Sequence, residues 1–303
     1  MTKNLASSVH QRLMNRAKAE QRPFNELLHY FVLERFLYRL GISPYARRFV
    51  LKGALMFNVW QGPSARPTRD IDLAGHMANT VEELVATIKA IGLTPASIED
   101  GLVFLPETVS GEPIIAGADY EGVRVSVIAK LGSARIPFHV DIGFGDLIYP
   151  AATLVQLPAL LDFPPPVLQG YSRESVIAEK FQAMVHHGEI NSRLKDFYDV
   201  WLLANKFEFD GATLAQAIRA TFEQRQTDLV LTPTAFGTEF AAETARQRQW
   251  TSFLTRSQIA DVPVNLIDVV ETLRRFLQPV TFALIARQDF HQHWPPGGPW
   301  LTA

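Results

Sequence analysis

The chain contains no cysteine among its 303 residues. This absence excludes disulfide bonds, thiolate zinc sites, iron–sulfur clusters and cysteine nucleophiles. Any metal ion would be held by carboxylates, histidines or water. The chain also lacks an uninterrupted apolar run of membrane-spanning length, and its first 20 residues lack the apolar segment of a signal peptide. We therefore expect a cytoplasmic protein that does not use a membrane as a partner.

The composition is that of a globular protein, with 47% hydrophobic and 20% charged residues. The charge is unevenly spread. Residues 1–52 hold ten basic and three acidic residues, a net charge of +7, whereas the other 19 basic and 28 acidic residues give −9. A basic segment of this kind suits a polyanionic partner such as RNA. Alternatively, the basic side chains only solvate two amphipathic helices.

Hydrophobic periodicity divides the chain near residue 157. Before it, helical patterns at 5–19, 25–40, 54–60 and 81–91 are interspersed with strand patterns at 49–51, 70–73, 102–105, 123–131 and 136–142. After the proline-rich stretch 157–166, only helices are expected, at 172–187, 192–205, 211–225, 234–254 and 264–277. The fold class is therefore α+β. A small mixed sheet with flanking helices (1–157, including two N-terminal helices) precedes a helical bundle (158–303) that would complete a cleft.

Asp70 and Asp72 lie two residues apart on a predicted strand, so their carboxylates leave the same face, with Cα atoms roughly 6.6 Å apart. Such a pair can hold one or two Mg²⁺ ions, with Mn²⁺ as a substitute. By itself the pattern also fits an exposed strand face or a pair of turn aspartates.

Gly53 follows an apolar strand and opens a helix, seventeen residues before Asp70. A glycine in that place lets a phosphate approach the backbone, where a helix N-terminus offers N–H groups. An ordinary strand-to-helix turn is the alternative. Together with the two carboxylates, the turn fits a nucleoside triphosphate.

Asp141 supplies a third carboxylate on a strand of strict alternation, facing the same way as His139. If this strand neighbours that of Asp70 and Asp72, Asp141 would share a second metal ion and take up the proton of an attacking hydroxyl. The alternative is an aspartate that caps the following turn.

Five stretches in this order resemble the AbiEii/AbiGii toxin family of minimal nucleotidyltransferases, within the DNA polymerase β-like superfamily. They are Phe49-Val-Leu-Lys-Gly-Ala-Leu55, Arg66-Pro-Thr-Arg-Asp-Ile-Asp-Leu73, Val140-Asp-Ile-Gly-Phe-Gly-Asp146, Glu174-Ser-Val-Ile-Ala-Glu-Lys180 and Arg193-Leu-Lys-Asp-Phe-Tyr-Asp199. The resemblance implies that Asp70, Asp72 and Asp141 bind the metal. It further implies that Lys52, Gly53, Ala54, Arg69 and Lys180 lie at the nucleotide, and that the family's K-D-x-x-D motif falls on Lys195, Asp196 and the catalytic Asp199.

Members of this family transfer a nucleotide from an NTP to an acceptor, in characterised cases the 3′ end of tRNA, and are commonly restrained by an antitoxin. The resemblance therefore implies an NTP substrate, an RNA acceptor and an antitoxin partner. One departure is that Ala54 stands where the family has glycine or serine, so no hydroxyl can reach the phosphate and backbone amides would serve instead.

Three alternatives stay open. Lys195 and Asp199 are four residues apart, so the helical motif could form a surface ion-pair ladder. The D-x-D pattern also occurs in glycosyltransferases, although only about fifty largely helical residues precede Gly53. A non-catalytic protein that binds nucleic acid or a partner is the third.

Overall fold

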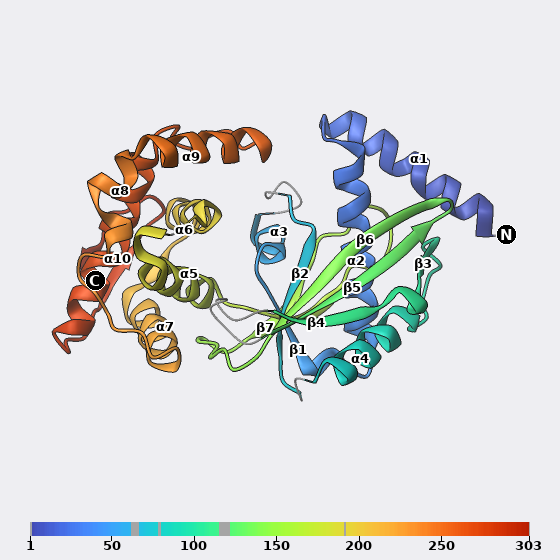
Figure 1. Cartoon of the computed structure of the whole chain (residues 1–303), viewed down its shortest axis with the longest axis horizontal. Helices are drawn as coiled ribbons and strands as arrows, with labels where there is room; N and C mark the ends of the chain where they lie inside the picture. The colour runs from blue at the N-terminus through green and yellow to red at the C-terminus, as the bar shows by residue number, and fades with distance from the viewer. Residues whose placement is uncertain (1, 62–66, 78–79, 115–121, 191, 303) are drawn as a thin grey trace. The chain divides into compact units, whose positions relative to one another are not determined.

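The structure is a computed structural model that describes residues 2–61, 67–77, 80–114, 122–190 and 192–302 (Figure 1). The chain forms two compact units. The first comprises Met1–Gly145 and Ala152–Tyr171, and the second Asp146–Ala151 and Ser172–Ala303. The expected boundary is residue 157, whereas the first unit extends to residue 171, because one further strand, Val167–Gly170, joins its sheet. Each unit is described by itself below.

The first unit is built on a mixed eight-stranded sheet, as the α+β class requires. Its strands are β1 (Phe49–Lys52), β2 (Asp70–Gly75), β3 (Leu102–Phe104), β4 (Ser110–Ile114), β5 (Gly122–Leu131), β6 (Ala134–Gly143), β7 (Thr153–Gln156) and β8 (Val167–Gly170). Their order is β3-β5-β6-β2-β1-β8-β7, with β4 also paired to β5. The central strands β2 and β6 are parallel, as are β1 and β8, and the other pairs are antiparallel.

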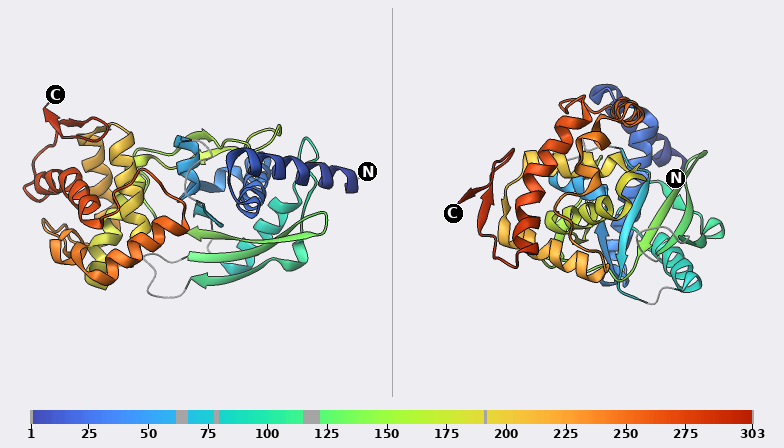
Figure 2. Two further views of the ribbon diagram at one scale, coloured as in Figure 1. Left: turned by 90° about the horizontal axis from the view of Figure 1, so that it is seen from above. Right: turned by 60° about the vertical axis from the view of Figure 1, so that its left-hand side comes forward.

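Four helices accompany this sheet: α1 (Thr2–Glu20), α2 (Phe24–Ile42), α3 (Leu55–Gln61) and α4 (Val81–Leu93). Alternation along β6 buries Phe138 and Val140 on one face and leaves His139 half-exposed on the other. Helix α2 packs against β6 and β8, and α4 against β4 and β5 (Figure 2). The face that carries the polar residues is therefore opposite the buried aromatic core of the unit.

Three strands of this sheet escape the sequence analysis. β4 contains Gly111 and Pro113, and the side chains of β7 are mostly exposed, so neither has the alternating apolar pattern of a strand. β8 has only four residues and lies between β7 and β1, where all four pair with β7 and Gly170 also pairs with Leu51. The expectation that no strand follows the proline-rich stretch is wrong, because β8 forms by pairing with these two strands without a strong local signal.

The second unit is mainly helical. Its helices are α5 (Arg173–His187), α6 (Leu194–Lys206), α7 (Gly211–Gln224), α8 (Thr238–Ala242), α9 (Thr244–Arg256) and α10 (Leu266–Ile285). The expected single helix 234–254 is wrong, because extended backbone at Gly237 and Glu243 separates a 3₁₀ turn (η4, Thr234–Phe236), α8 and α9. Helix α10 continues through Pro279, beyond its expected end at 277.

A small sheet of three strands completes this unit: β9 (Phe209–Asp210), β10 (Gln292–Trp294) and β11 (Leu301–Thr302). Its aromatic side chains account for its presence. The Trp294 ring lies 4.8 Å from that of Phe276, and its Nε1–H donates to the Ala204 carbonyl at 2.7 Å. Within the part of the chain that the structure describes, no helix is long and apolar enough to cross a membrane.

Candidate active site

One row of charged side chains runs across five strands of the first unit. Register partners on successive strands are Lys52 (β1), Asp72 (β2), Asp141 (β6), Arg124 (β5) and Glu112 (β4). Because partners opposite one another in a sheet project from the same face, these five side chains share one side of the sheet. The two carboxylates that sequence analysis placed on different strands are therefore direct neighbours, with a cation on either side.

A second polar row lies two residues along the same face. Asp70 is the register partner of His139, which is the partner of Ser126. The Ser126 hydroxyl lies 3.1 Å from His139 Nδ1. On α2, His29 Nε2 lies 3.0 Å from the Arg69 carbonyl, and burial lowers the pKa of His29. Asp70 thus lies in a polar setting of two histidines and a hydroxyl.

The turn after β1 lies directly against Asp72. Gly53 has φ +69°, and a Cβ built on it would meet Asp72 Oδ2 at 2.0 Å. A side chain at this position is therefore excluded both by backbone conformation and by the carboxylate. The two features that the sequence pairs, the glycine turn and the aspartates, are in contact.

The neighbours of Gly53 are enclosed. Lys52 is buried, and its ammonium lies 5.7 Å from the centroid of the Tyr171 ring. Ala54 is also buried, whereas Arg69 is exposed. Arg66, which belongs to the quoted motif, lies outside the described residues.

Asp141 is held by Arg124. Arg124 Nε donates to one carboxylate oxygen at 2.8 Å and Nη2 to the other at 2.7 Å. This forked hydrogen bond raises the pKa of Arg124. The carboxylate is only 12% exposed, whereas the arginine side chain is 40% exposed. Both oxygens of the third acid are therefore already engaged.

The donor set suits a hard divalent cation, since carboxylate oxygens are the ligands that Mg²⁺ prefers. The arrangement nevertheless differs from a finished metal site. Among the described residues, no three His, Asp or Glu side chains converge as metal ligands. Both carboxylate oxygens of Asp141 accept hydrogen bonds from Arg124 instead.

A second group of charges joins α5 to α6 in the helical unit. Lys180 Nζ lies 2.5 Å from Asp196 Oδ1 and 2.9 Å from Asp199 Oδ2, and Arg193 Nε lies 2.9 Å from Asp196 Oδ2. Both aspartates are buried, with side-chain exposures of 1% and 0%. Burial alone raises the pKa of Asp196, but Lys180 and Arg193 outweigh it and lower that pKa.

This geometry decides one alternative. The surface ladder between Lys195 and Asp199 is wrong, because Asp199 is buried and pairs with Lys180 while Lys195 is exposed. The motif residues Lys180, Asp196 and Asp199 are brought together within the second unit. The first unit brings together the other predicted residues that lie close to one another, which are Lys52, Gly53, Ala54, Asp70, Asp72 and Asp141.

Arg124 contacts a predicted site residue, Asp141, but is not among the candidate residues predicted from the sequence. The available signal was weak: Arg124 occupies an outward position of an alternating strand, as does Ser126. Nothing in the sequence states that Arg124 faces Asp141, because cross-strand register depends on the whole sheet.

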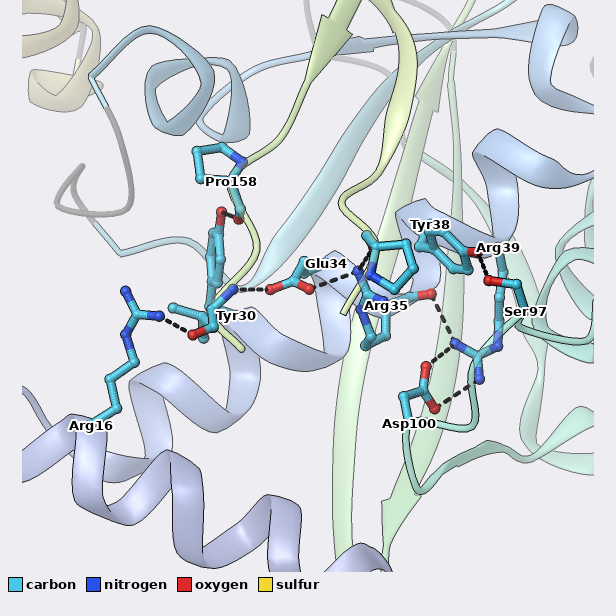
Figure 3. A network of polar contacts seen from close by, with 11 residues as sticks. Arg16, Tyr30, Glu34, Arg35, Tyr38, Arg39, Ser97, Asp100 and Pro158 are labelled. Carbon is cyan, nitrogen blue, oxygen red and sulfur yellow. Dashed lines mark hydrogen bonds and ion pairs between the residues drawn. The ribbon is translucent and has the colours of Figure 1, made fainter. Parts of the chain in front are cut away.

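The basic side chains of the first two helices are largely engaged inside the first unit (Figure 3). Buried Arg35 pairs with Glu34, and Arg39 makes a forked bond to Asp100. Within the part of the chain that the structure describes, ion pairs are formed by Arg12, Arg16, Arg22, Arg35 and Arg39. Lys18, Arg47 and Arg48 are exposed.

A family model described as "Nucleotidyl transferase AbiEii toxin, Type IV TA system" matches residues 35–277. Among curated proteins no match was found. Two similar solved structures are JHP933 from Helicobacter pylori (14% identity, 87% of this chain and 98% of that one, TM-score 0.46) and an antigenic nucleotidyltransferase-like protein from Paracoccidioides brasiliensis (12%, 78% and 94%, TM-score 0.32).

Proposed function

The chain belongs to the AbiEii nucleotidyl transferase toxin family, and we propose that it transfers a nucleoside monophosphate from an NTP to a hydroxyl of an RNA acceptor, such as the 3′ end of tRNA, in a Mg²⁺-dependent reaction. The family makes it a nucleotidyltransferase. The metal, the acceptor and the pairing with an antitoxin are the parts that we propose.

One observation carries the proposal. Asp72 and Asp141 are register partners on parallel strands, Asp70 shares their face, and the carboxylate of Asp72 lies against the Gly53 turn. Acidic metal ligands beside a glycine turn are the components that a nucleoside triphosphate requires. A D-x-D glycosyltransferase would explain neither this turn nor the match of residues 35–277 to a nucleotidyl transferase family.

The chain's own residues would act by position and charge. Asp70 and Asp72 would hold Mg²⁺, which when bound neutralises phosphate charge and favours in-line attack. The open backbone at Gly53 would admit the phosphates close to Lys52, whose positive charge lies in the same row. Asp141, once freed from Arg124, would take up the proton of the attacking hydroxyl at its carboxylate.

The helical unit holds a further cation of the quoted motifs, Lys180. Two buried aspartates fix its ammonium, so the geometry supports Asp196 and Asp199 as positioning residues for that lysine. The exposed cations Lys18, Arg47 and Arg48 would contact RNA phosphates, and such binding should weaken as salt rises.

The test is incubation of the full chain with each α-³²P-labelled NTP, total tRNA and Mg²⁺, beside an Asp70→Ala/Asp72→Ala variant. Label on RNA with the wild type alone is expected, and the labelled NTP identifies the base. Label on the protein would replace the RNA acceptor with self-modification. The absence of label from RNA and protein alike, with correctly folded protein, would refute transfer to tRNA.

The remaining parts have separate tests. Absence of any Mg²⁺-dependent shift in melting temperature with NTPs would favour a protein that binds without catalysis. For the antitoxin, we expect that expression of this chain stops growth and that the protein encoded beside it restores growth. Growth that continues despite active enzyme would argue against a toxin.

A further inference from the structure

The forked pair between Arg124 and Asp141 occupies the oxygens that a metal ion would need. A carboxylate that accepts two hydrogen bonds from one guanidinium presents its best lone pairs to that guanidinium. A divalent cation needs the same lone pairs. Arginine and metal therefore compete for Asp141.

Arg124 also has a second acidic neighbour. Its register partner on the other side is Glu112 of β4, an exposed residue. Negative charge at Glu112 and Asp70 adds to the rise in the pKa of Arg124, after the hydrogen bond and charge of Asp141. The arginine therefore lies between two carboxylates in one row, and its 40% exposure leaves room for the side chain to turn.

We propose that Arg124 is a built-in competitor of the metal ion: it holds Asp141 in the metal-free protein and moves to Glu112 when a divalent cation takes Asp141. This inference rests on the proposed function, since it concerns regulation of the same site. The row of charged side chains gives a physical reason for the contact between Arg124 and Asp141. Without a metal, Asp72 and Asp141 are adjacent like charges, and Arg124 offsets their repulsion.

The exchange of Arg124 between Asp141 and Glu112, called the switch below, predicts opposite effects on metal affinity for variants of Arg124 and of Glu112. Arg124→Lys keeps the positive charge but lacks the planar fork, so it should hold Asp141 less firmly and bind metal roughly three- to fivefold more tightly. Arg124→Gln removes the competitor and should tighten binding roughly tenfold. Glu112→Gln removes the second position of the arginine and should weaken binding about twofold.

The experiment is a titration of the full chain with Mn²⁺, without nucleotide, in which free Mn²⁺ is read by electron paramagnetic resonance. Lys130→Gln is the matched control for loss of a positive charge, because Lys130 lies on the same strand and the same face, six residues away. It should leave the affinity nearly unchanged. In an Asp141→Asn background, Arg124→Lys should no longer tighten binding.

The outcomes separate the switch from the function on which it rests. If Asp70→Asn and Asp72→Asn leave Mn²⁺ binding at the wild-type level, the metal site of the proposed function is wrong. If both variants lose the metal but Arg124→Lys binds as wild type, the proposed function stands and the switch is refuted. Weaker binding by folded Arg124→Lys also refutes it, because the arginine would then orient Asp141 for the metal.

Discussion

The molecule contains two pairs of closely spaced aspartates, and their surroundings are opposite. Asp70 and Asp72 lie on a strand, half-buried, on the polar face of the sheet. Asp196 and Asp199 lie on a helix, buried, and share the ammonium of Lys180. In the sequence both patterns resemble metal or catalytic motifs. The structure leaves the first pair half-buried on the sheet face and places the second in an internal ion-pair network.

The difference teaches that spacing alone does not determine what surrounds a pair of aspartates. Spacing of two on a strand and of three on a helix each place two carboxylates on one face. What separates the pairs is the neighbouring element. Beside β2 lie the glycine turn, Lys52 of β1 and the strand that carries Asp141. Beside α6 lies Lys180 of α5, whose ammonium pairs with both aspartates.

The largest effect is expected at the sheet pair. Asp72→Asn should reduce nucleotide transfer about 10³-fold or more, because metal charge stabilisation is worth several kcal/mol in the transition state. The variant should still fold, since the amide has the shape of the carboxylate that lies against Gly53. Transfer assays and thermal melts of the same preparation measure both. Retained transfer would contradict the assignment.

The helix pair should show the reverse order of effects, with stability as the main loss. Asp199→Ala leaves Lys180 with one of its two buried partners and should cost about 3–5 kcal/mol of unfolding free energy. Urea denaturation measures this loss. Exposed Lys195 provides the control, and Lys195→Ala should change stability by less than about 0.5 kcal/mol. Equal losses of stability in the two variants would instead support the surface ion pair between Lys195 and Asp199.

A third buried acid sharpens the comparison through pH. Burial raises the pKa of Glu34 to about 7, although the side chain pairs with Arg35 and accepts the Leu160 N–H at 2.7 Å. The folded protein therefore holds this proton more tightly than the unfolded chain, and stability falls as pH rises from about 4.5 to about 7. This contribution is on the order of 3 kcal/mol.

The variant Glu34→Gln should lose that pH dependence. The stability of the wild type relative to the variant is then higher at pH 5 than at pH 8, as measured by denaturation at both values. A relative stability that is constant over this range would show that Glu34 stays ionised in the folded protein.

Asp196 should respond to pH in the other direction. Its pKa is lowered in the folded protein, so the stabilisation by Lys180 and Arg193 is present above the ordinary value near 4 and is lost as pH falls through the lowered value. The difference in melting temperature between the wild type and Asp196→Asn should therefore become smaller below about pH 4. A difference that grows on acidification would contradict the lowered pKa.

Much of the fold was predictable because its signals are local. The two N-terminal helices and the strands around Asp70 and Asp141 have apolar residues at the period of their own element. Strands β4, β7 and β8 were not predictable, because they form by pairing with distant segments. The break at Gly237 falls at a glycine with extended backbone, which the helical periodicity of 234–254 does not reveal.

The candidate site shows the same division. The sequence by itself determined that Asp70 and Asp72 share a face, that Gly53 opens a turn and that Asp141 faces the same way as His139, since each depends on the geometry of one element. Only the tertiary structure decided that Asp72 lies beside Asp141, that Arg124 grips Asp141, and that Lys180 joins Asp196 to Asp199. These contacts connect residues between 16 and 69 positions apart, and their register is fixed by the packing of the sheet and of the helices, which no local pattern encodes.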